Sequence, residues 1–200
     1  MHHGGTALLD PFALLERAGL DQGFHVADFG CGSLGHFIFP AASIVGGSGR
    51  VYAVDILKTA LDAITRKARQ HQYFNIHPVW SDIERVEATR IPPRSLDLAL
   101  LVASLGSLSN REGVMQEVHR LLKPGGAFLI IEWKPEERVL GPQQEYRISL
   151  DELRVHVGED RFHEEEAFDA GDAHYGLLLR RAPGEFDSDV LHISHPLISH

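Results

Sequence analysis

The chain has 200 residues, of which 44% are hydrophobic and 24% charged, so it predicts one globular domain with a full core. Its formal net charge of −9 disfavours a nucleic-acid partner, because phosphate neutralisation requires dense Lys and Arg. The single cysteine, Cys31, excludes an intramolecular disulfide and a cysteine zinc site, which suits a reducing cytoplasm.

Residues 1–23 predict an N-terminal flanking helix. Asp10 precedes Pro11 at the first helical position, apolar residues recur through 14–18, and Gly19 ends the pattern. Neither this segment nor any other has an apolar run long enough for a signal peptide core or a bilayer span. The sequence therefore predicts a soluble, cytoplasmic protein without a transmembrane segment.

Seven segments are predicted to be strands. They are Phe24–Phe29, Arg50–Asp55, Ile76–Trp80, Leu96–Val102, Ala127–Glu132, Phe162–Phe168 and His174–Arg181. Four strands with helical segments between them predict right-handed βαβ units and a parallel sheet. The connection at 170–172 is too short for a crossover, so the last two strands are expected to be antiparallel.

Helix starts are predicted from capping-box spacing at two places. Ser109 stands three residues before Glu112, and Ser149 three residues before Glu152. The first of these helices is expected to end at the Lys-Pro-Gly-Gly sequence of residues 123–126, immediately before the fifth strand.

From residue 182 the composition becomes linker-like and acidic. We expect residues 1–181 to form the single domain and 182–200 to form a disordered or loosely docked tail, with an edge strand or a homodimer contact as the alternative. The spaced tail histidines, His192, His195 and His200, are expected to be exposed to solvent, and no metal site is predicted.

The stretch Val26–Phe37, VADFGCGSLGHF, predicts a buried strand, a glycine-rich turn and a helix start. Gly30, Gly32 and Gly35 allow backbone to approach a ligand and direct helix N–H groups toward an anionic group. This glycine pattern alone fits a nicotinamide dehydrogenase as well as other nucleotide-binding classes. An acidic residue ending the second strand, Asp55, accepts hydrogen bonds from ribose hydroxyls in either class.

Two further features are uncommon in the dinucleotide-binding pattern of the dehydrogenases and typical of another family. They are Asp28 within the first strand and the Leu-Lys-Pro-Gly-Gly sequence before the fifth strand. The matching segments are DFGCGSLG at 28–35, AVD at 53–55, SD at 81–82, LDLALLVASL at 96–105 and LLKPGG at 121–126. With these segments the chain resembles the class I S-adenosylmethionine (SAM) dependent methyltransferases, in the small-molecule branch related to the ubiquinone and menaquinone methyltransferases. The resemblance spans 26–181 and implies a Rossmann-like, doubly wound α/β fold whose seven-stranded sheet is mostly parallel, with an antiparallel C-terminal hairpin.

The resemblance implies cofactor contacts in the turn. Gly30, Cys31 and Gly32 would pass beneath the methionine part of SAM. Asp28 would orient its ammonium group, and Asp55 would bind both ribose hydroxyls. A purely structural alternative for Asp55 is a helix N-cap.

The remaining implied contacts follow strands two, three and four. Ile56 would pack on the adenine, and Asp82 would accept a hydrogen bond from its exocyclic amine, with Ile83 alongside. The structural alternative for Asp82 is that its side chain only caps a turn. Backbone around Val102 and Ala103 would line the sulfonium and the substrate side.

The resemblance has one departure within the turn. Leu34 occupies the position where the family has its third glycine, and Gly35 follows one residue later. Either Leu34 narrows the space beside the methionine, or Gly35 performs the role of the missing glycine.

Methyl transfer requires no dedicated catalytic side chain, because SAM supplies the reactive methyl and the protein supplies orientation. Polar residues on the expected substrate side are the candidates for an assisting base. They are His36, Ser104, Glu132, His174 and Tyr175. In contrast, Asp97 at the start of the fourth strand is expected to be structural.

The resemblance implies an enzyme that transfers a methyl group from SAM to a small-molecule or lipid-like acceptor. With Cys31 as the one thiol, arsenite is excluded as acceptor. Val102-Ala103-Ser104-Leu105 replaces the Asn/Asp-Pro-Pro-Tyr/Phe motif that accompanies methylation of adenine or glutamine nitrogens, which disfavours these acceptors. The alternatives are a SAM-binding protein without methyl transfer and an NAD(P)-dependent oxidoreductase.

Overall fold

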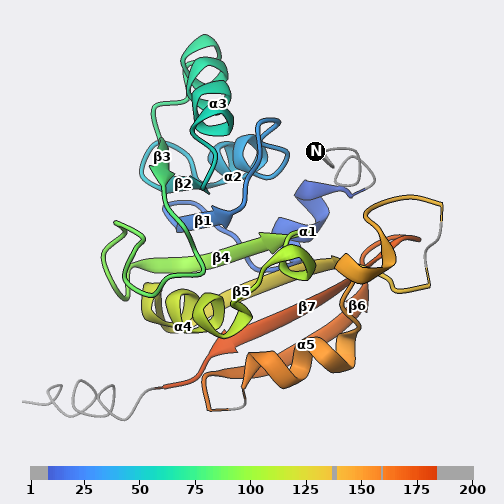
Figure 1. The fold of residues 1–200 in the computed structure, drawn as a ribbon. Coiled ribbons are helices and arrows are strands. Elements are labelled where there is room, and N and C mark those ends of the chain that lie inside the picture. Colours follow the sequence, from blue (N-terminus) through green and yellow to red (C-terminus); the bar gives the residue numbers. More distant parts are fainter. Residues whose placement is uncertain (1–8, 137–138, 159, 184–200) are drawn as a thin grey trace, which may run out of the picture.

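The computed structural model describes residues 9–136, 139–158 and 160–183. Its seven strands form one sheet in the order β3-β2-β1-β4-β5-β7-β6 (Figure 1). The strands are β1 (His25–Phe29), β2 (Arg50–Asp55), β3 (Ile76–Trp80), β4 (Leu96–Val102), β5 (Leu122–Trp133), β6 (Phe162–Asp169) and β7 (His174–Arg181). β1 to β5 are parallel, and β7 is antiparallel to both β5 and β6. The predicted fold class is confirmed.

Helices cover both faces of the sheet (Figure 1). They are α1 (Pro11–Arg17), α2 (Ile38–Val45), α3 (Lys58–Gln70), α4 (Arg111–Leu121) and α5 (Leu150–Val157), with short 3₁₀ turns η2 (Leu105–Ser107) and η3 (Gln144–Tyr146). Because successive strand side chains point to opposite faces, Leu98 and Leu100 of β4 pack in the core beneath α1, α2 and α3. Ala99 and Leu101 pack in the core beneath α4 and α5. Within the described residues, no helix is long and apolar enough to cross a membrane.

The predicted helix caps are partly confirmed. Asp10 caps α1, and Ser149 forms the expected capping box with Glu152 at α5. The prediction for α4 is wrong by one residue: its N-cap is Asn110, whose side chain accepts from the Gly113 N–H. A distant carboxylate displaces the local motif, because Glu84 accepts from the backbone N–H groups of residues 109 and 110.

The Lys-Pro-Gly-Gly sequence lies inside β5 rather than before it. Leu96 pairs with Leu122 and Leu98 with Ala127, so residues 123–126 form an irregularity in the ladder between β4 and β5. Gly125 adopts a φ of 72°, which favours glycine. The expectation that this sequence separates helix from strand is therefore wrong, although α4 does end just before it.

Asp97 is structural, as expected. It accepts from the His25 backbone N–H at 2.8 Å and pairs with Lys123 Nζ at 2.6 Å. Both contacts lie where β1 and β4 begin, at the opposite end of the sheet from the glycine turn.

Candidate cofactor and active site

The glycine turn lies where the sheet order changes direction. β1 pairs with β2 on one side and β4 on the other, so the connections that leave their carboxyl ends diverge and leave a crevice. The Gly30 N–H donates to the Val54 carbonyl at 2.8 Å. A Cβ at Gly30 would lie 3.2 Å from Ser104 Oγ, so the turn approaches the end of β4 closely. The turn is thus fixed to the ends of β2 and β4.

Asp55 ties the turn to the next helix. One carboxylate oxygen accepts from the Gly32 N–H at 2.9 Å, and the other accepts from the Leu57 N–H at 2.8 Å just before α3. Each carboxylate oxygen has a further lone pair for a ligand hydroxyl. The N-cap of α3 is Leu57 and no side chain caps this helix, so the N-cap alternative for Asp55 is wrong. The residue is 8% exposed, and its binding of ribose hydroxyls stays a prediction.

Asp28 is the most unusual charged group of the site. Its side chain lies beside Asp55 and is 4% exposed, and no hydrogen bond reaches its carboxylate from the described residues. Burial, and secondarily the neighbouring Asp55, raises the pKa of Asp28 from 3.8 to about 7. A buried acid next to a second acid and without a donor provides a suitable partner for a ligand cation.

Gly35 is required for packing below the turn. Its φ is 64°, and a Cβ there would lie 2.6 Å from Ile64 Cδ1 and 2.7 Å from the Phe39 ring. The Leu34 side chain is 53% exposed, and its carbonyl accepts from Lys67. Gly35 thus allows the turn to pack on α2 and α3. How Leu34 affects cofactor affinity stays a prediction.

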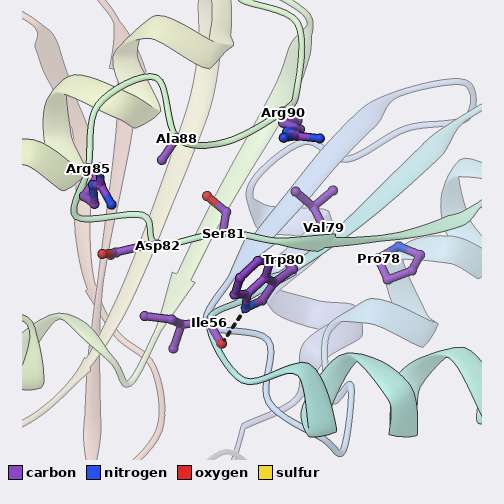
Figure 2. A pocket seen from close by; sticks show the side chains of 9 residues that line it. All are labelled: Ile56, Pro78, Val79, Trp80, Ser81, Asp82, Arg85, Ala88 and Arg90. Atoms are coloured by element: carbon purple, nitrogen blue, oxygen red, sulfur yellow. Dashed lines mark hydrogen bonds between the residues drawn. The ribbon is translucent and has the colours of Figure 1, made fainter.

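A pocket of about 780 Å³ lies beyond the ends of β2 and β3 (Figure 2). Its lining includes two of the predicted adenine contacts, Ile56 and Asp82. Asp82 also accepts from the Glu84 N–H at 3.0 Å, as its turn-capping alternative requires. Ile83 packs at the margin of the core beneath α4 and α5.

Val102 ends β4 and Ala103 follows it directly, and their contact with the sulfonium side stays a prediction. Ala103 has a φ of 51°, and its N–H donates to the Ile131 carbonyl at 2.8 Å. The Ser104 hydroxyl donates to the Val102 carbonyl at 3.1 Å. This catalytic candidate is thus engaged with its own backbone.

Glu132, at the end of β5, positions the turn after β4. It is 1% exposed and accepts from the Leu105 N–H at 2.6 Å, at the start of η2. Burial raises the pKa of Glu132 to about 7, although backbone N–H groups of β5 and η2 oppose that rise. Its contacts are those of a residue that holds β4, β5 and η2 together.

The other candidate bases also have contacts inside the chain. His36 Nε2 lies 3.0 Å from the Leu9 carbonyl, which holds the segment before α1. The Tyr175 hydroxyl donates to the Ile148 carbonyl at 2.8 Å. His174 is 1% exposed, and its ring centroid lies 4.1 Å from that of Trp133.

A buried carboxylate that was not predicted from the sequence fixes the loop after β3. Glu117 is fully buried in α4, accepts from the Glu87 and Thr89 N–H groups at 2.8 and 3.1 Å, and binds Arg120 through two oxygens. Burial raises the pKa of Glu117, but the hydrogen bonds from Arg120 and from both N–H groups bring it below its ordinary value. The signal in the sequence is that Glu117 lies on the apolar helix face between Val114 and residue 121, where an acid needs partners inside the protein.

The fold and the site define a class of protein: a doubly wound α/β domain that binds a nucleotide cofactor at its switch point. Residues 20–172 match the family model described as a methyltransferase domain, and the chain belongs to this family. Its place is among the class I SAM-dependent methyltransferases, as the sequence predicted.

Curated relatives include the ubiquinone/menaquinone biosynthesis C-methyltransferase UbiE of Pseudoalteromonas translucida, which is 28% identical over 137 residues. That alignment covers 66% of this chain and 52% of the relative, so the chain spans about half of that relative's length. The UbiE of Cupriavidus necator is 26% identical over 178 residues, with 76% of this chain and 69% of that protein covered.

Solved structures share the fold. A SAM-dependent methyltransferase from Aquifex aeolicus superposes with a TM-score of 0.81 at 24% identity, covering 88% of this chain and 92% of that one. The cyclase SpnF superposes with a TM-score of 0.73 at 16% identity, covering 87% and 81%. The same architecture thus occurs in a protein described as a cyclase, so the fold by itself does not define the reaction.

Proposed function

We propose that this chain transfers the methyl group of SAM to a small, lipid-like acceptor. The observation that carries the proposal is Asp28, a buried carboxylate at the switch point without a hydrogen-bond donor from the described residues. The ammonium group of SAM is a cation that such a carboxylate would bind. A nicotinamide dinucleotide brings a pyrophosphate to the same turn, which two adjacent carboxylates would repel.

The residues around the crevice suit each part of this cofactor. Gly30, Cys31 and Gly32 offer close backbone beneath the methionine, because a side chain at Gly30 would contact the end of β4. Asp28 would hold the ammonium group, and the free lone pairs of Asp55 would accept from the ribose hydroxyls.

The adenine would lie farther along the same edge of the sheet. Ile56 is 59% exposed and offers an apolar surface for the ring. Asp82 has one carboxylate oxygen engaged with a backbone N–H, which leaves the other for the exocyclic amine. Ile83 would flank the ring, and backbone at Val102 and Ala103 would line the sulfonium side.

SAM, when bound, supplies an electrophilic methyl group. The chain's own contribution is to hold the acceptor in line with that methyl, and such positioning can lower a barrier by roughly 7–11 kcal/mol. Glu132 would serve this role by fixing η2 beside the end of β4. His36, Ser104, His174 and Tyr175 remain candidates for proton transfer only if acceptor binding releases them from their contacts.

The acceptor class follows from charge and from the relatives. A net charge of −9 disfavours nucleic acid, and the relatives' names describe C-methylation in ubiquinone and menaquinone biosynthesis. We therefore favour a small, lipid-like acceptor in the cytoplasm. The tail beyond residue 183 lies outside the described residues, and a homodimer contact through it remains part of the proposal.

Titration calorimetry with SAM, S-adenosylhomocysteine and NADH tests the cofactor. We expect both SAM and its product to bind, and Asp55→Asn to weaken both, whereas Asp62→Asn, an exposed acid on α3, leaves both unchanged. Thermal melts without ligand check that each variant folds. Unchanged affinity in Asp55→Asn refutes the site, and selective NADH binding supports the oxidoreductase alternative.

Transfer of label from methyl-labelled SAM into lipid and water-soluble metabolite fractions tests the reaction. We expect label in the lipid fraction. Tight product binding without transfer to any fraction would support the alternative of a SAM-binding protein that performs no methylation.

A further inference from the structure

The pocket beside edge strand β3 extends beyond the proposed adenine contacts (Figure 2). Its volume of about 780 Å³ lies within the range of small-molecule sites. Val79 and Trp80 contribute apolar and aromatic surface, and Arg85 and Arg90 line it from the loop after β3. This combination of an aromatic wall with two cations differs from what adenine recognition needs.

Both arginines lack a partner from the described residues: neither guanidinium of Arg85 or Arg90 has a hydrogen bond or ion pair there. Elsewhere in the described chain, Arg17, Arg120 and Arg154 are paired with carboxylates, whereas Arg66 and Arg69 on α3 are exposed and also lack a partner but do not line this pocket. Acidic residues outnumber basic ones 28 to 19 in the sequence, so partners are abundant. Two uncompensated guanidinium groups in one pocket therefore favour an anionic ligand.

The loop that carries these arginines is held at both ends. Next to Arg85, the Glu84 carboxylate accepts from two backbone N–H groups just before α4. Next to Arg90, the Thr89 N–H donates to buried Glu117 at 3.1 Å. The backbone beneath each guanidinium is thus fixed, which lowers the entropy cost of binding a ligand between them.

Trp80 provides the opposite wall. Its indole N–H donates to the Ile56 carbonyl at 2.9 Å, and Lys58 Nζ lies 4.0 Å from the ring centroid. The residue is still 60% exposed. A large aromatic surface that is anchored yet exposed offers a flat ligand an offset-stacked contact.

We propose that this pocket binds an aromatic anion, a flat ring bearing a carboxylate or a phosphate, while SAM is bound. The ring contacts Trp80, and the anionic group is bound by Arg85 or Arg90, which line different parts of the pocket (Figure 2). The inference rests on the proposed function, which places the adenine on Ile56 and Asp82, two residues of the same pocket's lining, and leaves the remainder of the pocket to the second ligand. Because β2 and β1 separate β3 from β4, the ligand lies far from the methyl and acts as an effector rather than as the acceptor.

Calorimetry on the full chain saturated with S-adenosylhomocysteine tests the site. The titrants are 2-naphthoate, 2-naphthyl phosphate and the neutral 2-naphthamide, so the arms separate carboxylate from phosphate and charge from ring stacking. We expect at least one anion to bind about tenfold more tightly than the amide, as a charge-assisted pair of hydrogen bonds predicts.

The double variant Arg85→Gln/Arg90→Gln is expected to abolish that tenfold preference. Its matched control is Arg66→Gln/Arg69→Gln, which removes two exposed positive charges from α3 and is expected to keep the preference. No difference between anion and amide in the unmodified chain overturns the proposal, as does an equal loss in both variants.

Competition also distinguishes the outcomes. If S-adenosylhomocysteine excludes the anions, the pocket is only part of the adenine site and the proposal is overturned. Product affinity is measured separately, by the calorimetry that tests the proposed function. Failure of anion binding with intact product binding therefore refutes this site while leaving the proposed function standing. Loss of product binding itself would refute the proposed function.

Discussion

Replacing Asp28 with Asn tests two effects of this buried carboxylate: it lowers the unfolding free energy of the free chain, and it raises the affinity for SAM. Burial and the nearby Asp55 raise the pKa of Asp28 from 3.8 to about 7. At about 1.36 kcal/mol per pKa unit, this difference corresponds to roughly 4 kcal/mol of unfolding free energy. The carboxylate is 4% exposed, so solvent does little to reduce that cost.

The sign follows from proton binding. Between pH 3.8 and about 7 the folded chain holds a proton on Asp28 that the unfolded chain has released. Stability without ligand therefore falls as pH rises through this window, and the full cost is present above it. Asp28→Asn has no such proton, so its stability gain over the unmodified chain should be greater at pH 8 than at pH 5 by roughly 2–3 kcal/mol.

Urea unfolding at both pH values measures this difference, and calorimetry measures the ligand side. Loss of a charge-assisted hydrogen bond of about 1.5–3 kcal/mol should weaken SAM binding roughly tenfold to a hundredfold at pH 8. In the unmodified chain, SAM affinity should increase as pH rises through 7. Asp62→Asn is the control for both measurements. A stability gain independent of pH, or unchanged SAM affinity, would refute this account of Asp28.

Three other substitutions test the supports of the site. Gly35→Ala should lower the unfolding free energy by roughly 2–4 kcal/mol through overpacking and a strained φ, whereas Gly125→Ala, which has open space around it, should lose only about 1 kcal/mol; urea unfolding compares them. Glu117→Gln should lose roughly 2–4 kcal/mol near neutral pH, and less as pH falls below 4.5, because the lowered pKa of Glu117 makes its stabilisation depend on ionisation. For Glu132→Gln, the unfolding free energy relative to that of the unmodified chain should be roughly 1–3 kcal/mol more favourable at pH 8 than at pH 5, because burial raises the pKa of Glu132 from 4.5 to about 7. The same difference in urea midpoint between variant and unmodified chain at both pH values would contradict this.

Local sequence patterns were sufficient to predict the strands. β2, β3, β4 and β7 have the predicted bounds. For central β4 the reason is that a strand buried on both faces needs a continuous apolar run. β5 begins five residues earlier than expected, at Leu122. The added residues form an irregularity in the pairing with β4. This part of β5 is rich in glycine, and its composition does not show which distant strand it pairs with.

The α4 cap shows the same limit at a single residue. The spacing of Ser109 and Glu112 satisfies the local capping rule, yet Asn110 caps the helix. The deciding group is Glu84, about 25 residues away, whose carboxylate accepts the two N–H groups that precede the helix. A motif of four residues cannot contain a competitor that only the tertiary fold brings near.

The cofactor site was predictable to the extent that strand ends define it. Asp28, Asp55 and Asp82 follow from their positions along strands whose carboxyl ends share one edge of the sheet. The pocket's cationic wall did not follow, because Arg85 and Arg90 lie in a loop with no periodic pattern. Their arrangement depends on carboxylates from α4 and from the loop itself, which the sequence alone does not place.

The two acids of the crevice differ in what the fold does for them, and this difference bears on function. Asp55 has backbone donors on both oxygens, so the folded chain stabilises it whether or not a ligand is present. Asp28 receives no such donor from the described residues, and its charge opposes folding at neutral pH. These two backbone hydrogen bonds would explain Asp55 without any ligand, but no hydrogen bond from the described residues stabilises an ionised Asp28. The ammonium of SAM would compensate its charge, so Asp28 carries more weight than the glycines in assigning the cofactor.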